Sequence, residues 1–107
     1  MFEIFGNLFA RTENSKLGEA IQQGAFLVDV RMPYEFEADK VKGSVNIPLN
    51  RLQGELEKFK DKKSIVVFCR SGNRSGQAKA ILEQNGFRNV INGGTSQNLH
   101  AYVNQEK

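Results

Sequence analysis

The sequence predicts a single-domain α/β protein, with a central, mostly parallel sheet of about four to five short strands and helices on both faces. Three observations support this prediction. Residues 25–30 and 64–68 are almost continuously apolar, which is typical of strands buried on both faces. Segments with helical spacing of apolar residues separate such runs. The chain has 107 residues, close to the commonest domain size and long enough for one core.

The N-terminal region predicts an extension followed by the first helix and strand. We expect residues 1–14 to form an amphipathic extension and residues 15–107 to form the domain. Apolar side chains of the extension fall on one side of a short helix; they are Phe2, Phe5, Leu8 and Phe9. We expect this helix to pack on the domain, with a membrane or partner contact as the alternative. Apolar residues at positions 17, 20 and 21 then predict a helix that ends near Gly24, before the strand at 25–30.

The middle of the chain predicts short elements. After Met32 and Pro33, residues 34–38 have room for only a helical turn. Residues 45–47, followed by Pro48, predict a second short strand. Apolar residues at 49, 52, 56 and 59 form one face of a helix, despite Gly54. Residues 64–68 predict the next strand, because they are rich in Val and Ile.

The C-terminal third predicts two helices and one strand. A helix after residue 75 is expected to bury Ala78, Ile81 and Leu82 and to stop at residues 85–86, where Asn and Gly form a left-handed C-terminal signal. Residues 88–91 predict a final short strand, followed by a turn at 92–94. Apolar residues at 99, 102 and 103 indicate a last helix.

Composition argues against several classes of function. The 15 Lys and Arg residues are interspersed with 12 Asp and Glu residues. No stretch combines charges of a single sign with interleaved aromatic residues, so we expect no nucleic-acid binding. No run approaches the roughly 18 apolar residues of a membrane span. The N-terminus lacks a basic region, a continuous apolar region and a cleavage site. We therefore expect a cytoplasmic protein, while export of a processed precursor stays open.

Cys69 is the single cysteine of the chain, which limits its chemistry. The chain has no second cysteine for an internal disulfide or for a cysteine-based zinc site. We predict no metal and no organic cofactor. A lone cysteine also fits a reducing compartment.

A short polar arc follows the apolar run 64–68. Its residues are Cys69, Arg70, Ser71, Gly72, Asn73, Arg74 and Ser75. A helix begins at once, so the thiol is expected where a buried strand turns into a helix N-terminus. Backbone N–H groups at that end, together with the guanidinium groups of Arg70 and Arg74, favour a thiolate and lower the pKa of the thiol. An inert buried cysteine is the alternative, but so many polar neighbours are unusual for core packing.

The predicted topology brings other polar residues to the same edge. In parallel sheets, ligands bind beyond the carboxyl ends of the strands. Cys69 lies at one such end, Asp29 and Arg31 lie at the end of the first strand, and Gly93 and Gly94 follow the last. The arc is therefore predicted to be a nucleophile within an anion-binding loop.

Three stretches of the chain resemble the single-domain rhodaneses, the thiosulfate-type sulfurtransferases. They are Val28–Phe36 with Lys42–Leu49 behind it, Cys69–Ser75, and Asn92–Gly94. The resemblance covers about residues 17–102 and implies a rhodanese-like, three-layer domain. It implies that the Cys69 thiolate attacks the outer sulfur of thiosulfate, releases sulfite and keeps the sulfur as a persulfide. Cyanide or a thiol then accepts the sulfur, so two-step, ping-pong kinetics follow.

The same resemblance implies roles for the neighbouring residues. Arg70 and Arg74 attract and orient the anion, while N–H groups from Ser71 to Ser75 stabilise the persulfide. Asp29 and Arg31 support the pocket, either as a structural ion pair or in catalysis. The implied partners are thiosulfate as donor, a thiol such as glutathione or thioredoxin as acceptor, and a sulfur-relay protein. Without a second cysteine, an oxidised or persulfidated chain depends on an outside thiol.

Two alternative functions are compatible with the same sequence. Cysteine phosphatases and arsenate reductases use a similar loop, but they place five residues between Cys and Arg, whereas four separate Cys69 from Arg74. The chain could also be a non-enzymatic persulfide carrier or interaction module, a role that the sequence does not separate from an enzyme.

The chain departs from the family pattern in two places. Asp39 and Lys40 replace the Gly-His pair of many rhodaneses, and Thr95 and Ser96 follow Gly94 where a Gly and a Trp are usual. A more polar pocket rim is expected from the second change. The only histidine, His100, is expected to be a surface or packing residue.

Overall fold

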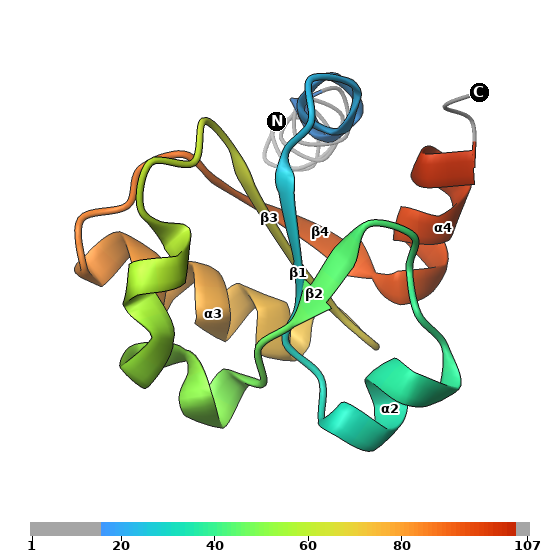
Figure 1. Cartoon of the computed structure of the whole chain (residues 1–107), viewed down its shortest axis with the longest axis horizontal. Helices are drawn as coiled ribbons and strands as arrows, with labels where there is room; N and C mark the ends of the chain where they lie inside the picture. The colour runs from blue at the N-terminus through green and yellow to red at the C-terminus, as the bar shows by residue number, and fades with distance from the viewer. Residues whose placement is uncertain (1–15, 105–107) are drawn as a thin grey trace, which may run out of the picture.

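A computed structural model describes residues 16–104, so the predicted extension at 1–14 lies outside the described residues. The first helix is described from residue 16 to 22. The remaining elements are β1 (Phe26–Asp29), α2 (Pro33–Ala38), β2 (Ser44–Asn46), η1 (Leu49–Phe59), β3 (Ile65–Cys69), α3 (Asn73–Gln84), β4 (Val90–Thr95) and α4 (Ser96–Asn104). All strand pairs are parallel, in the order β2-β1-β3-β4 (Figure 1). The predicted α/β fold is confirmed.

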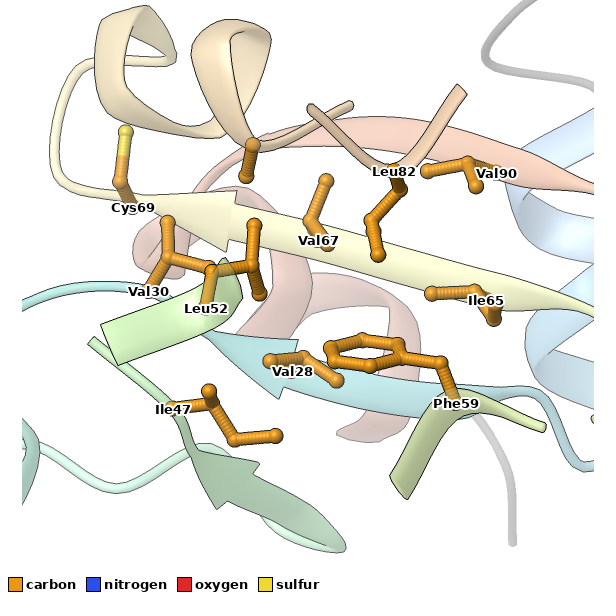
Figure 2. Close-up of a cluster of buried hydrophobic side chains, with 11 residues drawn as sticks. Val28, Val30, Ile47, Leu52, Phe59, Ile65, Val67, Cys69, Leu82 and Val90 are labelled. Atoms are coloured by element: carbon orange, nitrogen blue, oxygen red, sulfur yellow. The ribbon is translucent and has the colours of Figure 1, made fainter. Parts of the chain in front are cut away.

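Helices cover both faces of the sheet (Figure 1). Alternate residues of β3 point to opposite faces, so Val67 packs toward α3 and η1, and Phe68 packs toward the first helix and α4. One core therefore joins the sheet to α3 and η1; its members include Val28, Val30, Leu52, Phe59, Ile65, Val67 and Leu82 (Figure 2). A second core joins the sheet to the other two helices; its members include Leu17, Ile21, Leu27, Val66, Phe68, Leu99 and Val103. Every residue of β3 is buried, which explains its apolar sequence.

The strand order places the candidate residues together. β1 and β3 are neighbours at the centre of the sheet, so their carboxyl ends lie side by side. Asp29 closes β1 and Cys69 closes β3. The short helix α2 lies beyond this edge (Figure 1). The structure therefore brings Asp29 and Cys69 to the same edge of the sheet, as expected, whereas Gly93 and Gly94 lie within β4 and not beyond it.

The predicted final strand is present but begins at Val90, two residues later than expected, and the prediction of a turn at 92–94 is wrong. β4 instead runs through Asn92, Gly93 and Gly94 to Thr95. The pairing with β3 shifts at Gly93, because Val67 pairs with Asn92 and Phe68 pairs with Gly94. This is a β-bulge, which lets the strand continue through the two glycines. A Cβ atom at Gly93 would lie 2.8 Å from Leu99 Cδ2 and 2.9 Å from Val66 Cγ1, so packing requires glycine there.

Smaller differences concern η1, β2, β3 and α3. The predicted helical face at 49–59 is present, but the segment is 3₁₀-helical and is interrupted at Glu55, just after Gly54. β2 begins one residue earlier than expected, and β3 includes Cys69 itself. Ile81 of α3 is only partly buried, although it packs against the core as predicted.

Candidate active site

The active-site loop, residues 69–75, connects the end of β3 to the first turn of α3. Gly72 immediately precedes the helix and has φ +92°, a left-handed conformation that favours glycine. The first N–H groups of a helix have no partner within the helix, so they are free to bind another acceptor. Figure 2 shows the Cys69 sulfur pointing from the end of β3 toward this loop. The chain reversal therefore places the start of α3 around the sulfur.

Three hydrogen-bonding groups converge on Cys69 Sγ. The Gly72 N–H donates from 2.9 Å and the Ser75 N–H from 3.4 Å. The Ser75 hydroxyl oxygen lies 3.5 Å from the sulfur. Cys69 and Ser75 each have an exposed fraction of 0%. The buried thiol is thus surrounded by polar groups, which we call the sulfur cradle: the N–H groups of Gly72, Ser75 and Ser71 and the Ser75 hydroxyl.

The sulfur cradle lowers the pKa of Cys69. Burial by itself raises the pKa of the thiol, because it disfavours the thiolate. Hydrogen bonds from the Ser75 hydroxyl and from the N–H groups of Ser75, Ser71 and Gly72 outweigh that effect and bring the pKa below its ordinary value. The pKa of Cys69 is therefore lowered, as predicted. The main cause of the lowering is hydrogen bonding from neutral donors, and not the charge of the two loop arginines.

Arg74 is paired with Glu35 of α2. Nη1 lies 2.9 Å from Glu35 Oε1 and Nη2 lies 3.1 Å from Oε2, a two-pronged contact. The same carboxylate accepts the Met32 N–H at 2.9 Å. The Arg74 guanidinium lowers the pKa of Glu35 to about 2. Sequence reasoning missed Glu35. A signal was present, because Glu35 lies three residues after Met32, the residue that caps the start of α2, and a glutamate at this position is typical of a capping box.

Asp29 and Arg31 form a buried ion pair. Arg31 Nε lies 2.9 Å and 3.0 Å from the two Asp29 oxygens, and Nη2 lies 2.6 Å from Oδ2. Arg31 Nη2 also donates to the Asp39 carbonyl at 2.8 Å. Asn46 donates to the carbonyl oxygens of both Asp29 and Arg31 at 2.9 Å. These contacts fix the turn after β1, which favours the structural interpretation of the pair.

Arg70 lies on the wall of a cavity of about 620 Å³. The cavity is lined by Arg31, Tyr34, Glu35, Ala38, Asp39, Arg70, Thr95, Ser96, Gln97 and His100. Arg70 is exposed. Among the residues that the structure describes, no ion pair or hydrogen bond is recorded for its guanidinium group. The two loop arginines therefore differ, since Arg74 is engaged and Arg70 is available to a ligand.

His100 contributes to the cavity wall, a role that sequence reasoning missed. Its Nε2 lies 2.8 Å from Asp39 Oδ1, and the Ser96 hydroxyl lies 3.3 Å from Asp39 Oδ2. Hydrogen bonding from His100 is the main reason that the pKa of Asp39 is lowered. Asp39 thereby links the end of α2 to α4. Thr95 and Ser96 also line the cavity, so polar side chains form the part of its wall where a tryptophan is usual.

The remaining predicted loop residues lie on the outside. Ser71 and Asn73 are exposed, and the Asn73 N–H donates to the Ser71 hydroxyl at 3.4 Å.

Within residues 16–104, no three His, Cys, Asp or Glu side chains are grouped to hold a metal ion. No helix in that range is long and apolar enough to cross a membrane.

Comparisons with known proteins agree with this geometry. A family model described as the rhodanese-like domain matches residues 13–97. Thiosulfate sulfurtransferase PspE of Escherichia coli K12 is 39% identical over 69 residues, which cover 63% of this chain and 66% of PspE. The putative sulfur carrier protein YrkF of Bacillus subtilis 168 is 33% identical over 66 residues, which cover 62% of this chain and 36% of that protein. Both matches thus span less than two thirds of the relative.

A solved structure shows the same fold. The E. coli structure described as a rhodanese with anions is 33% identical and has a TM-score of 0.63. The likeness covers 68% of this chain and 88% of that one. The family match extends from before the first described helix to the start of α4, so it includes β1, the active-site loop and the bulge of β4. The chain belongs to the rhodanese-like family.

Proposed function

We propose that the chain is a sulfurtransferase that moves a sulfane sulfur from thiosulfate or a persulfide donor to a thiol or to cyanide. The observation that carries this proposal is the sulfur cradle, in which two N–H groups and a hydroxyl converge on Cys69 Sγ. Donors in this arrangement stabilise a sulfur anion, both as the thiolate and as a persulfide. Family membership and the named sulfurtransferase relative support the same activity.

The proposed reaction has two steps. The Cys69 thiolate attacks the outer sulfur of thiosulfate, the bond between the two sulfur atoms of the donor breaks, and sulfite leaves with the electron pair. The product is a Cys69 persulfide. An acceptor thiolate or cyanide then attacks the outer sulfur of that persulfide, and the Cys69 thiolate leaves. Arg70 attracts the anionic donor, because it is the loop arginine without a partner among the described residues.

The burial of Cys69 adds a requirement. With no exposed surface, the sulfur reaches a donor only after neighbouring side chains move. Arg70 belongs both to the loop and to the cavity wall, so we propose the cavity as the route of approach. Thr95, Ser96 and Gln97 in its wall can hydrogen-bond to a donor or acceptor, and Arg70 supplies a positive charge.

A persulfide carrier is the second candidate, which the putative sulfur carrier relative favours. A carrier would accept sulfur from a partner protein without turning over thiosulfate. Phosphatase or arsenate reductase chemistry is disfavoured, because four residues separate Cys69 from Arg74 and the smaller arc suits a sulfur atom better than a tetrahedral phosphoryl group.

Steady-state sulfur transfer from thiosulfate to cyanide distinguishes these functions. We expect turnover by the wild-type chain, parallel double-reciprocal lines when donor and acceptor are varied, and no turnover by Cys69→Ser. Ser64→Ala, which lies just before β3 at the opposite edge of the sheet from Cys69, serves as a control that retains activity. No turnover, combined with clean persulfidation by a persulfidated donor protein, would establish the carrier. Release of phosphate from an aryl phosphate, dependent on Cys69, would contradict both sulfur functions.

A further inference from the structure

Asn92 contacts the sulfur cradle from β4. Its side-chain Oδ1 lies 2.7 Å from the Ser75 hydroxyl oxygen and accepts the Gly94 N–H at 3.0 Å. Its Nδ2 lies 3.4 Å from the Gly72 carbonyl oxygen. The bulge at Gly93 separates Asn92 from Gly94 in the pairing with β3. Asn92 thus contacts both Ser75, which touches the sulfur, and Gly72, which immediately precedes α3.

The direction of the hydrogen bonds follows from the chemistry of the groups. A backbone N–H only donates, so the Asn92 atom bonded to Gly94 is the amide oxygen, which only accepts. Ser75 contacts the same oxygen, so its hydroxyl must donate to Asn92. A hydroxyl has one hydrogen. While this bond to Asn92 is kept, the Ser75 oxygen presents only its lone pairs to Cys69, and these accept the S–H of a thiol. The hydroxyl donates to a thiolate only after its hydrogen has turned away from Asn92.

The Gly72 and Ser75 N–H groups already donate to the sulfur, but donation from the Ser75 hydroxyl to a thiolate requires a rearrangement. When the thiol proton leaves to solvent, the Ser75 O–H rotates from Asn92 to the sulfur, and the Asn92 oxygen keeps only the Gly94 N–H. No bond other than S–H breaks. We propose that Asn92 is a positioning residue that competes with Cys69 for the Ser75 hydroxyl proton and so sets the balance between thiol and thiolate.

Among residues 16–104, the charged groups near the loop do not contact the Ser75 hydroxyl. Arg74 of α3 interacts with the charge of Cys69 but is paired with Glu35 of α2. Asp29 at the end of β1 and Arg31 just after it are paired with each other. Arg70 lines the cavity. Within residues 16–104, the recorded hydrogen bonds of the Ser75 hydroxyl are those with Cys69 and Asn92. The competition thus involves one buried proton and two acceptors.

The test is the pH dependence of Cys69 alkylation by iodoacetamide, a neutral reagent, in the full chain. Asn92→Ala frees the Ser75 hydroxyl, so the apparent pKa of Cys69 is expected to fall by roughly half to one unit, which is about three- to tenfold more thiolate at low pH. In a Ser75→Ala background, the same change is expected to have no effect. Asn89→Ala is the matched control, since this asparagine bonds the Lys62 and Lys63 carbonyl oxygens at the far end of the sheet.

The opposite sign overturns the proposal. If Asn92 merely braced the loop, its loss would loosen the donors and raise the pKa of Cys69. Asn92→Asp gives a second measurement if the alanine variant does not fold, because the carboxylate still accepts from Ser75 and Gly94. It is expected to raise the pKa, and by less when Ser75 is absent; an equal rise in both backgrounds contradicts the proposal. Because alkylation needs no sulfur donor, failure here is distinguishable from failure of the proposed sulfurtransferase function.

Discussion

The inner and outer sides of the active-site loop handle charge in different ways. On the inner side, the sulfur of Cys69 is fully buried and is surrounded by neutral donors from Gly72 and Ser75. On the outer side, Arg74 holds Glu35 and Arg70 borders the cavity. An arginine near a thiolate therefore need not be the group that stabilises it most. Here one arginine anchors the loop, and the other is available to a ligand.

The largest expected effect comes from removing the ion pair between Glu35 and Arg74, which holds the outer side of the loop. Glu35→Gln leaves Arg74 without a charged partner, and we expect a loss of about 1–3 kcal/mol in the free energy of unfolding. Denaturant unfolding measures this loss. Glu57→Gln is the matched control, because its ion pair with Lys60 is exposed, with the Glu57 side chain 85% accessible. Equal stability of Glu35→Gln and the wild type would show that the pair does not hold the loop.

The same pair gives stability a defined pH dependence. The pKa of Glu35 is lowered from 4.5 to about 2 by Arg74, so its contribution is fully present above about pH 4.5. The contribution is lost as pH falls toward 2, when the folded carboxylate becomes protonated. We therefore expect the stability of the wild type to fall more steeply than that of Glu35→Gln between these values. Parallel curves, measured by denaturant unfolding at each pH, would contradict the assignment.

The inner side is tested by removing its hydroxyl. Ser75→Ala takes away one donor to the thiolate, and we expect the apparent pKa of Cys69 to rise by roughly half to one unit. The pH profile of alkylation measures this shift. Thermal unfolding of the same variant provides the control for loop integrity. An unchanged profile in a folded variant would mean that backbone N–H groups alone set the ionisation of Cys69.

The smallest effect is expected from Arg70. Arg70→Ala should reduce kcat/KM for thiosulfate by about three- to tenfold, with the larger reduction at low ionic strength, because the side chain is exposed and its field is screened by salt. The alkylation profile should stay unchanged. Arg88→Ala removes an exposed arginine just before β4 and is the matched control. If Arg70→Ala shifts the alkylation profile as much as Ser75→Ala, the two sides of the loop are not separate in function.

Features that lie close together in the sequence were predictable. The nucleophile loop is one continuous arc, and Asp29 and Arg31 are two residues apart at a strand end. Contacts between distant segments were not predictable. Glu35 and Arg74 are 39 positions apart, and Ser75 and Asn92 are 17 apart. Such pairs meet only through the order of the strands and the bulge of β4.

The Gly-Gly pair shows why local signals fail. Two adjacent glycines suggest a turn, since glycine adopts conformations that other residues avoid. Gly93 is instead required by close packing against Val66 and Leu99, while the strand continues. That continuation carries Asn92 to the loop, so the error in the strand also concealed a contact of the site. Tertiary packing, and not local preference, decided the local structure.

The most direct test of the sulfur-carrying role is the intact mass of the chain after incubation with thiosulfate and removal of the excess. We expect the wild-type chain to gain one sulfur atom on Cys69, and we expect cyanide to remove that atom. Cys69→Ser should gain nothing. A wild-type chain whose mass is unchanged, under conditions in which Cys69 is readily alkylated, would contradict the proposal that this loop holds a persulfide.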